Sequence, residues 1–315
     1  MHPVYSVVVP CYNEEAVIRE THRRLSDVMR GMGEDYEILY VNDGSRDKTL
    51  PILKEIAETD PSAKVISFAR NRGHQIAVSA GLDYASGDAV VIIDADLQDP
   101  PELIPQMAEY WKSGSQVVYG QRIHRAGESR FKLLTAEIYY KIINRLTEGL
   151  IPRDTGDFRL VDRKVADVVR SMPEHSRFLR GMFSWVGFKQ TPLPYDRAPR
   201  FAGETHYPLK KMIRLALDGI VGFSIKPLKI AFYTGMIWTF FGFFTALVLL
   251  ILLCFGIAGG LWWLASLCMV LTGNILVCLG IAGEYIGRTF EDARNRPLYI
   301  VASTCNLDDR EQMRK

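Results

Sequence analysis

A long stretch without a charged residue restricts the folds open to this chain more than any other feature. No Asp, Glu, Lys or Arg lies between Lys229 and Glu284. A helix that crosses a membrane needs about 20 apolar residues, so the stretch predicts two spans joined by a short turn. The glycine-rich residues 256–260 mark the turn, and Trp262 and Trp263 follow it at the expected membrane interface. The alternative, one very long buried helix of a soluble protein, is disfavoured by this glycine cluster.

Basic residues on both sides of this hairpin predict its orientation. Cytoplasmic loops of membrane proteins carry an excess of Lys and Arg. We therefore expect both ends of the hairpin, and the remainder of the chain, on the cytoplasmic side of the membrane. No signal peptide is expected, because residues 3–10 have the pattern of a strand with no basic region before it. The flanking cations are Lys226 and Lys229 before the first span, and Arg288, Arg294 and Arg296 after the second.

Short apolar runs alternate with segments of helical periodicity over the first 120 or so residues. Strands that alternate with helices in this way indicate an α/β fold with a doubly wound, mostly parallel sheet. Asn13 is expected to cap a helix that extends to about Met32, because Asn side chains accept hydrogen bonds at helix N-termini. The tail after Val301 is expected to be mobile. The predicted strands are residues 4–9, 37–41, 64–68, 90–93 and 116–119, with an edge strand at 191–195 and a loop at 155–160.

Acidic and amide side chains follow the strand predicted at 90–93. Asp94, Asp96 and Asp99 lie there, with Gln98 between the last two. Ligands of open α/β sheets bind outside the carboxyl ends of the strands, and closely spaced oxygen atoms suit a hard cation such as Mg²⁺ or Mn²⁺. The missing G-x-G-x-x-G after the first strand argues against a dinucleotide site. The alternative is a turn that merely favours Asp.

Charge and cysteine content narrow the expected partners. The chain has 38 Lys and Arg against 36 Asp and Glu, a balance that gives no reason to expect nucleic acid. Its 5 cysteines have neither disulfide-like nor metal-like spacing, which fits a reducing compartment and no structural metal. Amphipathic segments over residues 131–143 and 210–223 are expected either to lie on a membrane surface or to pack on their own domain.

Seven short motifs follow one another along the chain. They are VPCYNEE at 9–15, VNDGS at 41–45, RNRG at 70–73, AGLD at 80–83, DADLQDPPE at 94–102, TGDFR at 155–159 and GEYIGR at 283–288. Each motif alone is weak, but their order over residues 4–300 resembles the polyprenyl-phosphate glycosyltransferases of family 2. These enzymes have the GT-A fold and include dolichol-phosphate mannose synthase. The resemblance is strongest to the bactoprenol glucosyltransferase branch, which has two C-terminal transmembrane helices.

The resemblance implies roles for the matching positions. Asp157 matches the acid usually proposed as catalytic, Asp96 and Gln98 match the ligands of a divalent metal, and Asp99 is expected to be only a neighbour. Relatives commonly have Lys where this chain has His206, and a His is only partly charged at neutral pH because its reference pKa is about 6.5. The positions that match the nucleotide-sugar site are Pro10, Tyr12, Glu14, Val41, Asp43, Asp94, Ala95, Asp96 and Arg122, and those assigned to the lipid phosphate are Arg130, Lys132, Arg200 and His206.

The resemblance also implies a reaction. A hexose, expected to be glucose, would pass from a UDP-sugar to undecaprenyl phosphate with inversion, and Mg²⁺ or Mn²⁺ would be the cofactor. The implied partners are the nucleotide sugar, polyprenyl phosphate and membrane lipid, with a homo-oligomer as the expected assembly. The expected divisions are a GT-A domain over 1–207, an amphipathic helix over 208–230, two spans over 231–283 and a cytoplasmic segment over 284–315.

Two other classes of function are open from the sequence. A processive polysaccharide synthase would need a Gln-x-x-Arg-Trp segment, which the chain lacks. A non-catalytic lipid-binding scaffold would have no use for Asp94, Asp96 and Asp157 together.

Several residues also have a second interpretation. Asp157 could act as a general base, or it could align an acceptor phosphate that is already anionic because its second pKa is about 6. It could also be a buried acid paired with Arg159. His74 is interpreted as a hydrogen-bonded loop histidine, and Phe183 and Trp185 as core residues rather than sugar-stacking ones.

Overall fold

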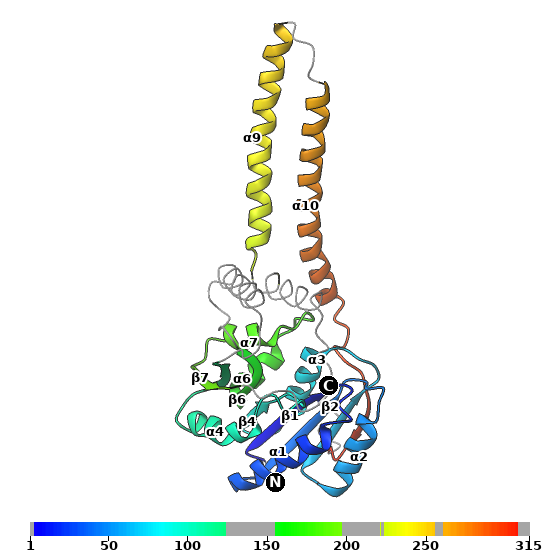
Figure 1. The fold of residues 1–315 in the computed structure, drawn as a ribbon, viewed down its shortest axis with the longest axis vertical. Helices are drawn as coiled ribbons and strands as arrows, with labels where there is room; N and C mark the ends of the chain where they lie inside the picture. Colours follow the sequence, from blue (N-terminus) through cyan, green and yellow to red (C-terminus); the bar gives the residue numbers. More distant parts are fainter. Residues whose placement is uncertain (1–2, 124–154, 197–220, 222–223, 256–260, 308–315) are drawn as a thin grey trace. The chain divides into compact units, whose positions relative to one another are not determined.

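The computed structural model describes residues 3–123, 155–196, 221, 224–255 and 261–307 (Figure 1). The chain divides into two compact units, one of residues 1–216 with 297–315 and the other of residues 217–296. The predicted turn at 256–260 and most of both amphipathic segments lie outside the described residues. The same is true of the predicted lipid-phosphate residues Arg130, Lys132, Arg200 and His206.

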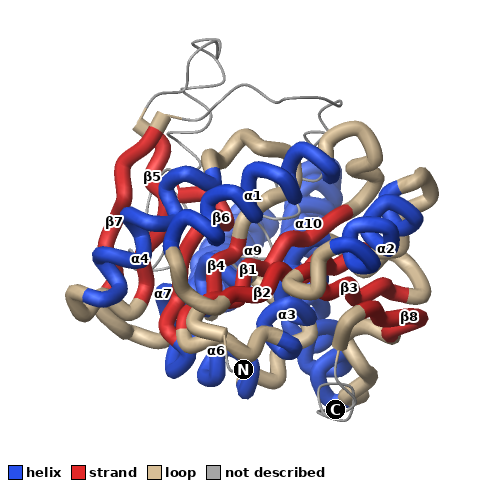
Figure 2. The backbone as a smooth tube through the Cα atoms, turned by 90° about the horizontal axis from the view of Figure 1, so that it is seen from below, coloured by secondary structure: helices blue, strands red, loops and turns tan. Residues whose placement is uncertain are grey.

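A mixed β-sheet forms the centre of the first unit (Figure 1, Figure 2). In the described part of the chain, eight strands pair in the order β7-β5-β6-β4-β1-β2-β3-β8. The pairs β1–β2, β1–β4, β2–β3 and β5–β7 are parallel, whereas β6 and β8 run antiparallel to their neighbours. The predicted α/β fold is confirmed. The strands are β1 (Tyr5–Cys11), β2 (Tyr36–Asn42), β3 (Ala63–Phe68), β4 (Ala89–Ile92), β5 (Val117–Arg122), β6 (Thr155–Asp162), β7 (Gln190–Tyr195) and β8 (Val301–Cys305).

Helices cover both faces of this sheet (Figure 2). On one face α1 contacts α2 and α4, and on the other α6 contacts α3 and α7. Strands covered on both faces are apolar throughout, and every residue of β1 and β4 is accordingly buried. The helices are α1 (Ile18–Met32), α2 (Thr49–Thr59), α3 (His74–Tyr84), the short 3-10 helix η1 (Pro101–Leu103), α4 (Ile104–Lys112), α6 (Arg163–Ser171) and α7 (Leu179–Trp185).

The first helix begins later than the sequence predicts. Asn13 has a left-handed φ of +57°, and α1 starts only at Ile18. Oδ1 of Asn13 accepts the N–H of Arg46 at 2.9 Å, and the N–H of Asn13 donates to Oγ of Ser45 at 3.0 Å. The predicted cap is therefore wrong, because Asn13 binds the loop after β2 instead of the start of α1. The helix does end at Met32 as predicted.

Two segments predicted to be irregular or mobile are strands. Residues 155–160 belong to β6, which lies between β4 and β5, and residues 301–305 form β8 beside β3. Asn306 then donates from Nδ2 to the carbonyls of Ala57 at 2.6 Å and Ala63 at 2.9 Å. The prediction for 155–160 is wrong, and so is that for the tail up to residue 307, because pairing with distant strands, and not the local sequence, determines the conformation of these segments. Residues 308–315 of the tail lie outside the described residues.

The two aromatic residues predicted to be in the core, Phe183 and Trp185, differ in how much of their side chain is exposed. Phe183 is fully buried, as predicted, whereas Trp185 is 63% exposed. The core prediction for Trp185 is wrong, because side chains two residues apart on a helix lie on nearly opposite sides.

The described residues of the second unit form two long apolar helices, α9 (Lys226–Cys254) and α10 (Leu261–Ala293), which lie side by side (Figure 1). Their membrane-length segments have mean hydropathies of 2.2 and 1.8, and no part of the corresponding windows is buried. Large apolar side chains outside the contact between the helices are exposed, such as Met269 at 76%. A soluble protein rarely exposes so large an apolar surface, so the two helices agree with the predicted hairpin.

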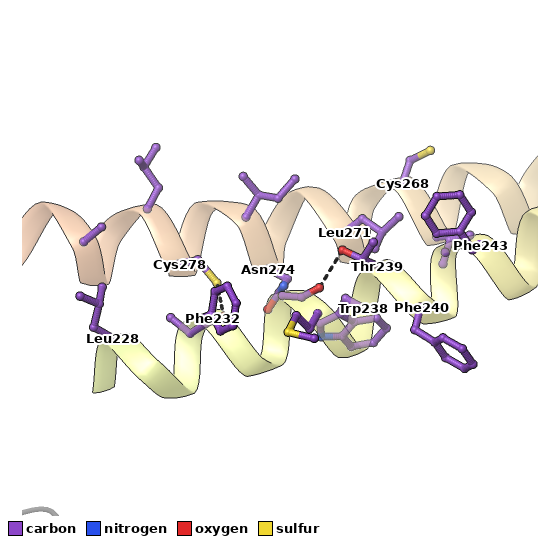
Figure 3. A pocket seen from close by; sticks show the side chains of 18 of the residues that line it. Leu228, Phe232, Trp238, Thr239, Phe240, Phe243, Cys268, Leu271, Asn274 and Cys278 are labelled. Atoms are coloured by element: carbon purple, nitrogen blue, oxygen red, sulfur yellow. Dashed lines mark hydrogen bonds between the residues drawn. The ribbon is translucent and has the colours of Figure 1, made fainter. Parts of the chain in front are cut away.

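A groove runs between α9 and α10 (Figure 3). Its lining is almost entirely apolar, with Thr239 and Asn274 as its hydroxyl and amide side chains. Oγ1 of Thr239 donates to the carbonyl of Gly235 at 2.8 Å, and Sγ of Cys278 donates to the carbonyl of Ala231 at 3.4 Å. These donors are thus satisfied within the hairpin, as an environment without water requires.

Glu37, at the amino end of β2, forms a buried ion pair with Lys64. The two charges are 2.7 Å apart and the Glu37 side chain is 3% exposed. Oε1 of Glu37 also accepts Oγ of Ser6 at 2.5 Å and the N–H of Ser86 at 2.7 Å. Burial favours the neutral carboxyl, but Lys64 and Ser6 outweigh it and lower the pKa of Glu37. This pair should therefore contribute to the stability of the first unit.

Replacing Glu37 with Gln should destabilise the fold by about 3–5 kcal/mol, because Lys64 loses its buried counter-charge. The melting temperature of the full chain in detergent, followed by circular dichroism, should fall. Glu55→Gln is the matched control, since its pair with Arg19 is solvent-exposed and worth about 0–1 kcal/mol. Equal losses in both variants would contradict the prediction.

The effect of Glu37→Gln should also depend on pH. Because folding lowers the pKa of Glu37, its contribution is complete above the unfolded-state pKa of about 4.3 and is lost as the pH falls through the folded value. The difference in melting temperature between wild type and variant should therefore shrink below about pH 4.3.

Candidate active site

The acids predicted to form the site lie at one edge of the sheet. Asp43 and Asp94 follow the carboxyl ends of the parallel strands β2 and β4. The antiparallel strand β6 pairs Arg159 with Ile92, so Asp157 near the start of β6 reaches the same edge. Three acids that are distant in sequence thus share the edge at which open α/β sheets bind their ligands.

His74, the first residue of α3, lies between Asp94 and Asp157. Its Nε2 is 2.8 Å from Oδ1 of Asp94, and its Nδ1 is 3.8 Å from Oδ2 of Asp157. Arg180 of α7 donates to both oxygens of Asp157, from Nε at 2.7 Å and from Nη2 at 3.0 Å. Such two-pronged Arg–carboxylate pairs are strong and fix the geometry. We call these four residues, His74, Asp94, Asp157 and Arg180, the charged cluster.

Opposite charges within the charged cluster keep both acids ionised. Burial would raise the pKa of Asp157, but Arg180 and then His74 hold it well below its usual range. The pKa of Asp94 is also lowered against the effect of burial, chiefly by His74. Burial would lower the pKa of His74, yet Asp94 and then Asp157 raise it to about 9. At neutral pH the charged cluster therefore contains two carboxylates, an imidazolium and a guanidinium.

Asp43 organises the loop that precedes α3. Its Oδ1 accepts the N–H of Arg72 at 2.6 Å, and its Oδ2 accepts the N–H of Gly73 at 2.8 Å. Gly73 has φ +97°, a conformation that favours glycine. Gly44 approaches the same loop so closely that a Cβ would lie 2.6 Å from the nitrogen of Asn71. Asp43 therefore sets the position from which α3 starts.

The loop after β4 presents oxygen atoms of Asp96 and Gln98. Leu97 between them has a left-handed φ of +57°, which turns the chain sharply. Asp96 is 8% exposed, and its Oδ1 accepts the N–H of Gln98 at 3.1 Å. The two predicted metal ligands are thus adjacent on one tight turn.

Asp99, expected to be only a neighbour of the site, is fully buried and supports Arg122. It accepts the hydroxyl of Tyr195, and its Oδ1 is 3.7 Å from Nη2 of Arg122. Nε of Arg122 donates to the Tyr195 hydroxyl at 3.4 Å. A Cβ at Gly156 would lie 2.7 Å from the same guanidinium, so Arg122 fits closely against the start of β6. Arg122 is therefore held against Gly156, the residue before Asp157.

The remaining predicted nucleotide positions lie at the same edge of the sheet. Most of their contacts are made by main-chain atoms. Pro10 and Val41 are register partners at the ends of β1 and β2, and Tyr12 just after β1 is 36% exposed. The N–H of Glu14 donates to the hydroxyl of the first residue of α2 at 2.8 Å. The carbonyl of Ala95 accepts a threonine hydroxyl of α1 at 2.7 Å. These contacts fix the backbone beside Asp43 and Asp94.

Two members of the charged cluster, His74 and Arg180, are absent from the predicted site. The prediction that His74 lies in a loop is wrong, because His74 is the first residue of α3. The one local feature that could have pointed to His74 is its position directly after Gly73, at the start of the helix. Arg180 has no motif around it. The alternative that Asp157 pairs with Arg159 is not what the structure shows: the Asp157 carboxylate pairs with Arg180. Arg159 donates to main-chain carbonyls at 3.0 and 3.3 Å and lies over the ring of Phe183.

Comparison with known proteins adds sequence relatives to this geometry. Residues 6–170 match the model of the family described as Glycosyl transferase family 2. The chain is 50% identical to "Uncharacterized glycosyltransferase YkcC" of Bacillus subtilis, over 99% of this chain and 98% of that one. It is 40% identical to "Prophage bactoprenol glucosyl transferase homolog" of Escherichia coli, over 94% of this chain and 97% of that one. With the bactoprenol glucosyl transferase of Shigella phage SfV the identity is 39%, over 94% and 97%.

A solved structure shares the fold. Glucosyl-3-phosphoglycerate synthase from Mycobacterium tuberculosis, in complex with Mn²⁺, uridine diphosphate and phosphoglyceric acid, superposes with a TM-score of 0.51 at 23% identity. The match covers 70% of this chain and 76% of that one. At this identity the likeness concerns the fold alone, and it confirms the expected GT-A-like arrangement of the first unit.

Proposed function

Since the chain belongs to glycosyl transferase family 2 and is a hexosyltransferase, we propose that it transfers glucose from UDP-glucose to undecaprenyl phosphate, with inversion at the anomeric carbon. The observation that carries this proposal is that Asp43, Asp94 and Asp157 lie at one sheet edge with Arg122. The described residues also include two helices of membrane-spanning length. Relatives named bactoprenol glucosyl transferase support glucose and the lipid acceptor.

The proposed reaction needs positive charge more than proton removal. The nucleophile is an oxygen of a phosphate monoester, which is already anionic because its second pKa is about 6. Negative charge develops on the departing diphosphate. Arg122, held by Asp99 and Tyr195, supplies a fixed cation toward that charge, and such an interaction is strongest in a site closed to water.

The turn after β4 fits a hard divalent cation. Asp96 and Gln98 offer one carboxylate and one amide oxygen, and no group of three or more His, Cys, Asp and Glu side chains suited to a metal occurs among the described residues. This small donor set suits Mg²⁺ or Mn²⁺ shared with a nucleotide, because such ions complete their shell with phosphates and water. When bound, the cation would neutralise charge on the leaving diphosphate. We therefore propose Asp96 and Gln98 as its protein ligands.

Asp157 is proposed to align the acceptor phosphate or the sugar rather than to take a proton. Arg180 and His74 hold its pKa well below its usual range, so it is a weak proton acceptor. A general base is also unnecessary for a nucleophile that is already anionic. The lowered pKa thus favours one of the two roles open from the sequence.

The membrane arrangement remains a proposal. We propose that α9 and α10 cross the bacterial inner membrane with both of their outer ends in the cytoplasm, supported by the basic residues that flank them. The predicted lipid-phosphate ligands, a homo-oligomer and the division at residues 207, 230 and 283 likewise stay predictions. Contact of the first unit with lipid headgroups would bring a lipid-phosphate acceptor within reach.

A donor panel tests the proposed function. Purified full-length protein would be incubated with undecaprenyl phosphate and UDP- or GDP-sugars, with and without Mg²⁺ or Mn²⁺. We expect the highest kcat/KM for UDP-glucose, loss of transfer after chelation of divalent cations, and its return on adding either metal. Absence of transfer from every donor would favour a non-catalytic scaffold and overturn the proposal.

A further inference from the structure

The residues before and after His74 in the chain hold it in place. The N–H groups of the two preceding residues bind Asp43 at 2.6 and 2.8 Å. After His74, α3 packs against β1 and β2, and a Cβ on Gly81 would lie only 2.1 Å from Cγ1 of Val8. Such close packing leaves the start of α3 little freedom to move relative to the strands that carry the acids.

The imidazole of His74 lies between Asp94, which follows β4, and Asp157, which belongs to β6. It is 2.8 Å from Asp94 at the end of β4 and 3.8 Å from Asp157 on β6. The side chains of His74 and Asp94 are each 27% exposed, and that of Asp157 is 12% exposed. The bridge is therefore largely shielded from solvent, where interactions between charges are strongest.

Removing this bridge would leave two like charges close together. Without the imidazole, Asp94 loses its hydrogen bond with Nε2 of His74, and Asp157 keeps its pair with Arg180. Repulsion between the two largely shielded carboxylates would push them apart.

Gln75 ties the start of α3 to the helix that carries Arg180. Its Oε1 accepts the N–H of Leu179 at 2.9 Å, and its Nε2 donates to Oδ2 of Asp157 at 3.5 Å. The segment formed by His74 and Gln75 thus contacts the surroundings of Asp157 from two directions. Contacts of this kind hold the side chains of a reaction site in position.

We propose that His74 is a positioning residue of the transfer reaction, and that its imidazole holds the carboxylates of Asp94 and Asp157 at a fixed separation. The inference rests on the proposed function, with Asp94 at the predicted nucleotide-sugar site and Asp157 aligning the acceptor phosphate or the sugar. His74 acts through these two acids. Its loss should therefore slow the chemical step much more than it weakens donor binding.

His74→Gln tests this role, because Gln can still donate one hydrogen bond but carries no charge. We expect kcat for glucosyl transfer to fall by about 10- to 100-fold, as for other small losses of alignment. The affinity for UDP, measured by titration calorimetry, should change by less than about threefold, since the backbone contacts of Asp43 remain. His22→Gln is the matched control: His22 also pairs with a carboxylate, Asp60 at 3.5 Å, but lies outside the charged cluster.

A double-mutant cycle separates positioning from a merely structural effect. If His74 acts through Asp157, His74→Gln should cost less than about threefold in rate when Asp157 is already Asn, because interacting sites are not additive. His74→Lys keeps a cation between the acids and should be faster than His74→Gln. An equal rate loss in both backgrounds, or a Lys variant no faster than Gln, would overturn the inference.

Wild-type protein measured beside these variants keeps the outcomes distinct. Failure of wild type to glucosylate undecaprenyl phosphate would overturn the proposed function. An active wild type with an equally active His74→Gln variant would overturn only the role of His74. If His74→Gln fails to bind UDP, His74→Lys replaces it in the cycle. The fold loss in rate caused by His74→Lys must then be smaller in the Asp157→Asn background than in wild type, and an equal loss would overturn the role of His74.

Discussion

Replacing Asp96 with Ala is expected to slow glucosyl transfer by about 1,000-fold or more, because a metal that neutralises the leaving group contributes several kcal/mol to the transition state. Asp96 supplies the only carboxylate of the proposed ligand pair with Gln98. The initial rate of transfer at saturating UDP-glucose and Mn²⁺ measures the effect. Titration calorimetry should also show that Mn²⁺ strengthens UDP binding to wild type but not to the variant.

Asp88→Ala is the matched control for this substitution. Asp88 immediately precedes β4, at the opposite end of the strand from Asp96, and its side chain is exposed. The control should transfer glucose at the wild-type rate. Near-normal turnover of Asp96→Ala in the presence of metal would show that the assignment of Asp96 to the cation is wrong.

Asp157→Asn should lower kcat by about 100-fold, because the neutral amide weakens the pairing with Arg180 and His74 and loosens the alignment of the reacting groups. The affinity for UDP should change little. Asp162→Asn, at the other end of β6, is the control: its Oδ2 accepts Nε1 of Trp111 and its Oδ1 accepts the N–H of Lys164, both at 2.9 Å, and Asn keeps one of these two acceptors. If Asp157→Asn weakens UDP binding as much as it slows transfer, Asp157 belongs to the donor site instead.

The pH profile distinguishes alignment from general-base catalysis by Asp157. Arg180 and His74 keep Asp157 ionised throughout the neutral range, so any fall in kcat toward acid near pH 6 should come from the acceptor phosphate, whose second pKa is about 6. That fall should persist in Asp157→Asn. Its disappearance from the variant would identify Asp157 as the general base.

The sequence predicts the strands that can be recognised from their own apolar residues. The runs around Val8, Leu39 and Val91 are apolar because these strands are buried on both faces, so the alternation of strands and helices follows from the sequence. β6 and β8 could not be found in this way. Their residues pair with strands distant in the chain, and the Gly and Asp at the start of β6 resemble a turn.

The site is predictable to the same extent. Asp43 and Asp94 stand directly after apolar strands, so their common edge follows from the fold class. The sequence contains no sign that His74 and Arg180 meet at Asp157, because that contact depends on how α3 and α7 pack. The predicted neighbour Asp99 gains its support of Arg122 only when β7 brings Tyr195 beside it.

The identity of the lipid product tests the central claim most directly. Purified full-length protein, UDP-glucose, undecaprenyl phosphate and Mg²⁺ would be incubated, and the extracted lipid would be analysed by mass spectrometry and NMR. We predict one product heavier than undecaprenyl phosphate by a single hexosyl group, in the β configuration that inversion of UDP-α-glucose gives, with one UDP released per lipid. Release of UDP without a hexosyl lipid, or a lipid that carries a growing sugar chain, would contradict it.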